Sequence, residues 1–151
     1  MKLTASKLNS FLFFKLPSAF LCGVRVKAID GNRCVVSVKH RWINQNPFQS
    51  MYFAVQAMAA ELSTGALVMN KIQESGRKIS MLVAHNKSSF TKKATGRITF
   101  SCDDGHKIEE AIKQTLTDGE GQTFCMKSIG TDEKGDQVSE MDFEWSVRLK
   151  K

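Results

Sequence analysis

The residue with the clearest chemical potential is an acid at the end of an apolar stretch. In the segment "NPFQSMYFAVQAMAAELSTG", residues 51–60 are apolar apart from Gln56, and Glu61 follows directly. A buried, unpaired carboxylate costs several kcal/mol, so Glu61 must be protonated, reach water, or pair with a base such as Lys71 or Arg77. In an apolar cleft its pKa would rise, making it a stronger base toward water. Glu61 is therefore a candidate general base.

The pattern around Glu61 predicts a helix. An apolar span of about 20 residues is too long for a strand, and we expect a helix from about Pro47, in its first turn, to about Asn70. Gly65 would mark a weak point or an early end. Small or apolar residues share the helical face of Glu61: Ala54, Ala57 and Met58. Their size leaves room beside the backbone for a ligand.

The rest of the chain predicts strands and one short helix. The predicted strand segments are a hairpin over 23–40 turning at 30–32, strands over 79–85 and 93–102, and a closing hairpin over 121–151. A helix over 103–116 should be capped by Asp103 or Asp104, with Glu109 paired to Lys113. Short connections favour an antiparallel sheet with one covered face.

This order of elements predicts an α+β fold of two layers in one domain, residues 1–151. The strongly apolar helix should cover the sheet. Because that helix is apolar all round, either the sheet curls tightly around it or a second chain covers the remainder. Dimerisation is the simpler resolution.

The N-terminal residues 1–21 are expected to form a helical segment packed on the domain. Lys15 and Pro17 interrupt the apolar run, no small-x-small cleavage site follows, and the run is too short to span a bilayer. Peripheral membrane contact is the alternative. Apolar residues at helical spacing predict a helix that ends near Pro17: Leu8, Phe11, Leu12 and Leu16.

Charge is unevenly distributed. Residues 1–102 hold fifteen basic and three acidic residues, whereas the remaining 49 hold seven basic and twelve acidic ones. A basic half is usually a solvated surface and sometimes binds an anionic partner. Nucleic acid is not expected, because the basic residues are not interleaved with exposed aromatic ones. A phosphate-bearing small ligand fits at least as well.

The cysteines and histidines predict no metal site. The four cysteines form no CxxC pair and no metal-like spacing with His40, His85 or His106. Reduced, buried cysteines fit a cytoplasmic protein. The histidines form no recognisable nucleophile–base arrangement and should be structural or exposed. We expect no metal and no other cofactor.

The segment "N-P-F-x-S-M-Y-F…A-A-E-L" within this order of elements resembles the hot-dog fold superfamily. More narrowly, it resembles an uncharacterised branch allied to phenylacetate-pathway-type (PaaI-type) acyl-CoA thioesterases. Their typical signature is an Asn, a His-Gly-Gly starting six residues later, and an acid nine residues after the His. Asn46, Tyr52 and Glu61 have these spacings, but Tyr52-Phe53-Ala54 replaces His-Gly-Gly.

The resemblance implies a curved antiparallel sheet wrapped around one long central helix, and a homodimer or a tetramer of such dimers. It also implies metal-independent hydrolysis of an acyl-CoA or related thioester, with Glu61 as general base. Asn46 would orient the water or hold the substrate carbonyl, and N–H groups around Tyr52, Phe53 and Ala54 would stabilise the oxyanion. Tyr52 can donate a hydrogen bond but cannot act as a base near neutral pH.

Three basic residues near a predicted strand start, Lys92, Lys93 and Arg97, would then be candidates to contact the phosphates of coenzyme A. A solvated strand end is their alternative.

For the whole protein, the alternative is a cleft that binds an acyl chain or acyl-CoA without turnover, which the loss of His-Gly-Gly favours. An acyl hydratase ranks lower, since the usual Asp/His arrangement is not visible.

Overall fold

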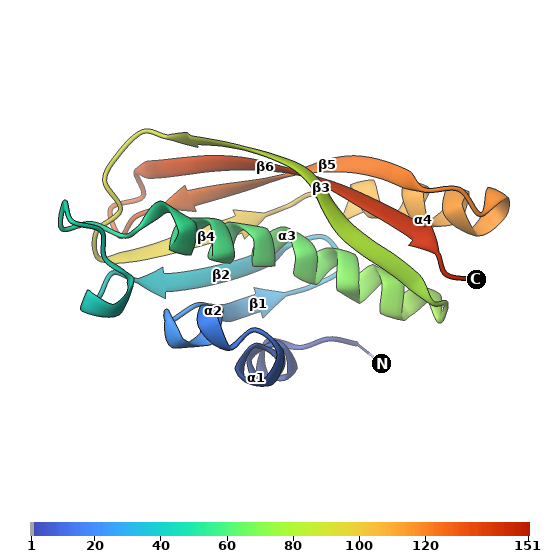
Figure 1. The fold of residues 1–151 in the computed structure, drawn as a ribbon, viewed down its shortest axis with the longest axis horizontal. Helices are drawn as coiled ribbons and strands as arrows, with labels where there is room; N and C mark the ends of the chain where they lie inside the picture. Colours follow the sequence, from blue (N-terminus) through green and yellow to red (C-terminus); the bar gives the residue numbers. More distant parts are fainter. Residues whose placement is uncertain (1) are drawn as a thin grey trace.

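A six-stranded antiparallel sheet curves around one long helix, as the resemblance implied (Figure 1). The computed structural model describes residues 2–151, and the strand order is β1-β2-β4-β5-β6-β3. In chain order the elements are α1 (Ala5–Lys15), α2 (Pro17–Leu21), β1 (Arg25–Ile29), β2 (Cys34–Lys39), a 3-10 turn (Trp42–Asn44), α3 (Phe53–Ser75), β3 (Ile79–Phe90), β4 (Arg97–Cys102), α4 (His106–Asp118), β5 (Gln122–Thr131) and β6 (Gln137–Leu149).

The long helix α3 begins later than Pro47 and runs past the expected end. Residues 46–52 form a loop instead, in which Asn46 Oδ1 accepts a hydrogen bond from the Phe48 N–H and Gln49 adopts a left-handed φ of 58°. Such side-chain to backbone bonds compete with helix formation, so Pro47 lies outside the helix. Gly76, at φ 65°, ends α3 with a left-handed C-cap.

Gly65 neither weakens nor ends α3. It is buried in the middle of the helix, where an added Cβ would lie 3.0 Å from Cζ2 of Trp145 on β6. The glycine therefore allows helix and strand to approach closely.

The sheet buries most of α3. Alternate side chains of β4 and β6 face the helix and are buried: Ile98, Phe100, Cys102, Met141, Phe143, Trp145 and Val147. One helical face stays partly exposed in the single chain, and its residues recur at helical spacing: Ala54, Ala57, Met58, Glu61, Met69 and Ile72. We call this face the half-buried stripe. The sheet thus curls tightly, but not completely, around the helix.

The helix α4 begins differently from the prediction. Its N-cap is Gly105, and the His106 N–H donates to Asn32 Oδ1 at 2.9 Å, so a distant turn replaces the expected aspartate cap. Glu109 accepts a hydrogen bond from Lys71 Nζ at 2.8 Å, and within residues 2–151 it forms no ion pair with Lys113, contrary to the prediction. These contacts join α4 to the β1–β2 turn and to α3.

The two edges of the sheet differ. At one edge, the side chain of Asn9 on α1 takes the place of a further strand beside β1. Its Nδ2 donates to the carbonyl oxygen of Val26 at 3.0 Å, and its Oδ1 accepts from the N–H of Val26 at 2.8 Å. At the other edge, β3 pairs with β6 on one side, and its residues 84–90 are all exposed. A long open edge is a surface that native proteins usually cover.

Candidate active site

Glu61 lies on the half-buried stripe without a charged partner. Its carboxylate forms no hydrogen bond or ion pair with any residue from 2 to 151, and burial raises its pKa to about 6. Lys71, the partner that the sequence suggested, pairs with Glu74 at 3.6 Å and Glu109 at 2.8 Å, and it lies ten residues, about 15 Å, further along the helix. Glu61 therefore titrates close to neutral pH, as a general base should.

Strand β6 sets the surroundings of that carboxylate. A Cβ on Gly65 would lie 3.0 Å from Trp145 Cζ2 and 3.3 Å from Glu61 Oε1, so the indole and the carboxyl group border the same glycine. The indole N–H is committed elsewhere, because it donates to Thr64 Oγ1 at 2.9 Å. Glu61 thus lies near an apolar ring edge, which disfavours its charged form.

The start of α3 offers two free donors. The Tyr52 N–H donates to the carbonyl oxygen of Asn44 at 2.9 Å, so it is already used. The N–H groups of Phe53 and Ala54, the first two residues of the helix, have no acceptor within residues 2–151. They lie at the positive end of the helix dipole, where a developing oxyanion is stabilised.

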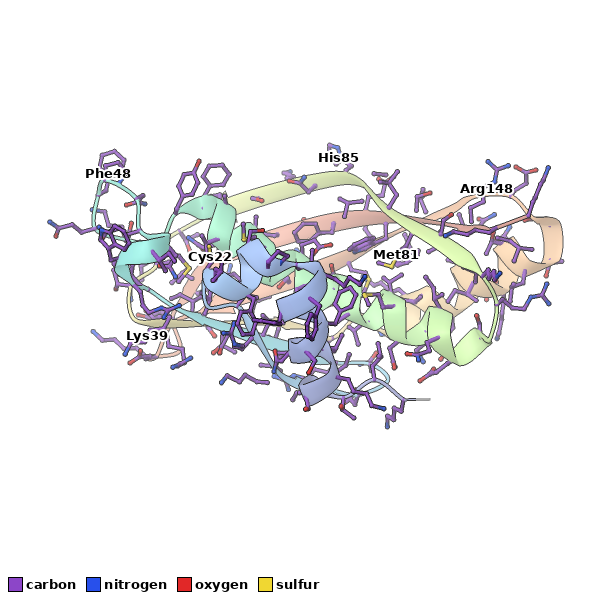
Figure 2. All side chains as sticks on the ribbon, turned by 60° about the horizontal axis from the view of Figure 1, so that its bottom comes forward. Cys22, Lys39, Phe48, Met81, His85 and Arg148 are labelled. Carbon is purple, nitrogen blue, oxygen red and sulfur yellow. The ribbon has the colours of Figure 1, made fainter. Side chains whose placement is uncertain are left out.

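A cavity of about 520 Å³ opens beside these donors. It lies between the loop before α3, the first turns of α3 and residues 90–94. Four aromatic side chains line it and remain substantially exposed: Phe48, Tyr52, Phe53 and Phe90. Figure 2 shows Phe48 at the tip of its loop, pointing away from the body of the molecule. An exposed aromatic cluster of this kind marks a binding surface.

Gln56 is a site residue for which sequence reasoning predicted no role. It lines the cavity, is only 4% exposed, and its Oε1 has no hydrogen-bond partner within residues 2–151. A buried amide oxygen without a donor costs about 1–3 kcal/mol. The signal was present in the sequence, since Gln56 is the one residue that interrupts the apolar run over 51–60.

Asn46 lies at the cavity wall, with its amide engaged in the loop. Its Nδ2 donates to Ser50 Oγ at 3.0 Å, and its Oδ1 accepts from the N–H groups of Phe48 and Ser50. In the single chain Asn46 therefore shapes the loop that carries the aromatic wall.

The three basic candidates do not lie together. Lys92 lines the cavity but is held by Asp132 at 2.6 Å and Asp136 at 2.8 Å. Lys93 also lines the cavity, and its Nζ lies 3.4 Å from the carbonyl oxygen of Phe48. Arg97 borders a separate hollow. Of the three, Lys93 is the free cation at the main cavity within residues 2–151.

Within one chain, Glu61 and the free donors are far apart. Ala54 and Phe53 precede Glu61 by seven and eight residues, which at 1.5 Å per residue gives about 10–12 Å along the helix axis. The single chain therefore does not bring the acid and the N–H groups to one carbonyl.

All four cysteines are free, and Cys34 and Cys102 are buried as expected, but Cys22 is only partly buried and Cys125 is exposed, contrary to expectation. Burial raises the pKa of both Cys34 and Cys102 to about 12, so they remain thiols at neutral pH. Residues 2–151 contain no cluster of three side chains suited to hold a metal ion. No helix in the same range is long and apolar enough to cross a membrane.

Residues 5–147 match the sequence profile of the family described as Domain of unknown function (DUF4442). The chain belongs to this family. No curated protein matches it by sequence.

Solved structures share the fold at low sequence identity. A protein of unknown function from Pseudomonas aeruginosa, described as "Probable Thioesterase", has a TM-score of 0.84 at 21% identity over 99% of each chain. A protein of unknown function from Chlorobaculum tepidum has a TM-score of 0.83 at 15% identity, also over 99% of each. A thioesterase from Haemophilus influenzae has a TM-score of 0.76 at 11% identity, over 99% of this chain and 93% of that one. At these identities, the comparison confirms the hot-dog fold alone.

Proposed function

We propose that two copies of this chain form a metal-independent thioester hydrolase. Each active site combines Glu61 of one copy with the N–H groups of Phe53 and Ala54 of the other. The observation that carries the proposal is the unpaired Glu61 carboxyl group, whose pKa burial raises to about 6. An acid kept without a counter-ion lowers stability, and such groups concentrate at functional sites.

The chemistry follows from these groups. Glu61 accepts a proton from water as the water oxygen bonds to the thioester carbonyl carbon. The resulting oxyanion accepts hydrogen bonds from the Phe53 and Ala54 N–H groups, which the helix dipole favours. When the intermediate collapses, the carbon–sulfur bond breaks, and the leaving thiolate takes the proton from Glu61. The products are a carboxylic acid and a thiol.

Geometry favours a site made by two copies. A base within hydrogen-bond reach of the attacking water and donors about 3 Å from the oxyanion cannot be about 10 Å apart on one helix. The open edge of β3 is the proposed interface between the two copies, because it exposes unpaired backbone groups and the side chains of Leu82 and Phe90. Phe90 also lines the main cavity, so a copy joined at this edge would reach it.

The substrate class follows from the cavity. Its aromatic lining favours an apolar acyl group, aliphatic or aromatic. The description of the P. aeruginosa protein as a probable thioesterase and of the H. influenzae protein as a thioesterase supports the reaction type, and acyl-CoA is the carrier that the sequence resemblance implies.

A complementation experiment tests the two-copy site. Phe53→Pro deletes one donor N–H, and proline suits the first position of a helix; Tyr52 before it already has the extended backbone that proline requires. Phe53→Ala is the matched control, since it loses the ring but keeps the N–H. Thiol release from acyl-CoAs should fall about a hundredfold or more further in Phe53→Pro than in Phe53→Ala, and comparably in Glu61→Gln.

Mixing the two inactive variants then distinguishes the geometries. After subunit exchange, half of the dimers hold one copy of each variant, and one of their two sites is intact. Activity should return to about a quarter of the wild-type value. No recovery in verified mixed dimers would place Glu61 and the N–H donors of each site on one chain and reject the two-copy site.

A second candidate function is binding of an acyl thioester without turnover. The Phe53 and Ala54 side chains, where the related signature has glycines, favour it by narrowing the approach to the N–H groups. Stoichiometric acyl-CoA binding with no thiol release over a panel of short, medium and aromatic acyl groups would select this candidate.

A further inference from the structure

A second hollow, of about 240 Å³, is lined by cationic side chains and one glycine. Arg25, Lys39, Arg41 and Arg97 surround it together with Gly23. None of the four cations forms an ion pair within residues 2–151; the ion pairs found there engage other basic residues. The hollow therefore concentrates positive charge without internal compensation.

The arrangement is electrostatically unfavourable when empty. Lys39 and Arg97 are direct partners in the β2–β4 register, and like charges opposite one another destabilise a sheet. Burial lowers the pKa of Arg25, and the neighbouring charge of Arg41 lowers it further. An anion between these four groups would relieve both repulsions.

Neutral acceptors hold the guanidinium groups in place. Arg25 Nη1 donates to the carbonyl oxygens of Phe20 and Val24, both at 2.8 Å, and Arg97 Nη1 donates to Ser37 Oγ at 3.3 Å. The Arg25 Cζ atom also lies 3.5 Å from the centre of the Phe20 ring. These contacts orient the cations but supply no anionic partner.

Arg41 passes over Gly23, whose φ is 91° and where a Cβ would lie 2.7 Å from Nη2. The glycine therefore gives that side chain its place at the hollow. Glu133 Oε1 accepts a hydrogen bond from the Arg97 backbone N–H at 2.7 Å, and no bond joins Glu133 to the guanidinium group. Glu133 lowers the positive potential of the hollow without occupying it.

We propose that this hollow binds the phosphate groups of a nucleotide. Arginine guanidinium groups match phosphate oxygens with paired hydrogen bonds, and three of the four cations are arginines. The volume suits a charged head group and not a complete ligand. Trp42 directly follows Arg41 and is 83% exposed, which provides a ring face on which a base can stack.

The hollow lies at the same end of the molecule as the main cavity. Figure 2 shows Lys39 and Phe48 at this end. A shallow surface lined by Trp42, Asn46 and Pro47, among others, shares Asn46 and Pro47 with the main cavity, and its Trp42 directly follows Arg41 of the hollow. A ligand with phosphates at Lys39 and a thioester at the cavity would follow this surface. The assignment of this nucleotide to the carrier end of an acyl-CoA rests on the proposed function, whereas the phosphate site itself does not.

Direct binding measurements test the site without catalysis. Calorimetric titration at low salt should detect coenzyme A and ADP, with much weaker binding of pantetheine, the phosphate-free thiol arm. Lys39→Gln should weaken ADP binding about three- to tenfold, and Lys39→Gln with Arg97→Gln should weaken it further. Lys39 is exposed and its side chain makes no hydrogen bond or ion pair within residues 2–151, so the single variant should fold normally. Added salt should weaken binding.

Lys113→Gln is the charge-matched control. Lys113 is an exposed residue of α4 outside both sites. Absence of ADP, pyrophosphate and coenzyme A binding, equal weakening by Lys113→Gln, or binding of polynucleotides alone would overturn the proposal.

Kinetics separate the two sources of the nucleotide. If Lys39→Gln raises KM for acyl-CoA but not for the matching acyl-pantetheine, the occupant is the carrier of the substrate. If ADP binding depends on Lys39 while both KM values stay unchanged, the occupant is a free nucleotide. Hydrolysis of acyl-pantetheine with no phosphate binding anywhere would reject this site and leave the hydrolase intact.

Discussion

The indole ring of Trp145 packs so closely on Gly65 that a Cβ there would stand 3.0 and 3.1 Å from its Cζ2 and Cη2 atoms. The same Cβ would be 3.3 Å from Glu61 Oε1. Strand β6 contributes no reacting group to the proposed mechanism, yet it provides the apolar wall that raises the pKa of the acid. Local helix composition and a distant strand together define the surroundings of the proposed base.

Gly65→Ala should therefore destabilise the protein, although alanine favours helices by about 1 kcal/mol over glycine. The added methyl group overpacks against Trp145 and should cost about 1–3 kcal/mol. Denaturant unfolding and Trp145 fluorescence report the change. Gly121→Ala is the control, because the nearest atom to its Cβ would be 4.0 Å away. Equal stability of the Gly65 variant and wild type would contradict this packing.

Glu61→Gln should stabilise the fold at neutral and alkaline pH. Folding raises the pKa of Glu61 from 4.5 to about 6, so the folded state holds its proton more tightly than the unfolded state. The charged form is therefore penalised by about 2 kcal/mol above pH 6, and the penalty disappears as pH falls through 4.5. Unfolding at pH 8 and pH 4 should show a gain for the variant at pH 8 only. Glu110→Gln, at an exposed position of α4, should not change stability at either pH.

Hydrolysis should depend on the same ionisation. Only deprotonated Glu61 can accept a proton from water, so kcat/KM should rise tenfold per pH unit below about pH 6 and level off above it. A profile that is flat from pH 5 to pH 8 would exclude Glu61 as the base.

Gln56→Leu should raise stability by about 1–2 kcal/mol in the unliganded protein, because it removes an amide oxygen that is buried without a donor. The same change should weaken ligand binding in the main cavity, where Gln56 is a polar group among aromatic ones. Thermal unfolding with and without acyl-CoA measures both effects. Gln73→Leu, exposed on the same helix, should give no gain; a destabilised Gln56 variant would show that the amide is already satisfied.

Leu82→Lys should dissociate the proposed dimer. Leu82 is 67% exposed on the open edge strand β3, and a lysine there would place like charges against each other across the interface. Leu21→Lys is the matched control, since Leu21 is 62% exposed on α2, away from that edge. Analytical ultracentrifugation should give half the mass for the first variant only. An unchanged mass would locate the interface elsewhere.

The sequence alone determined the elements and their order. Hydrophobic period is a property of neighbouring residues, so the helix, the strands and the position of Glu61 beside Ala57 and Met58 followed from it. The start of the helix could not be predicted in this way. Pro47 suits a first helical turn, but the hydrogen bonds of Asn46 hold residues 46–52 in a loop.

Tertiary structure decided which polar groups have partners. Lys92 looked free in the sequence, but its aspartates lie in the turn between β5 and β6, forty residues away and beyond any local pattern. Lys71, which the sequence offered as a partner for Glu61, pairs with Glu109 of α4, and ten residues of helix, about 15 Å, separate it from Glu61. The pairing of a charged side chain depends on segments that only the folded sheet brings together. For that reason, the sequence identified the acid, and the fold determined that it stands alone.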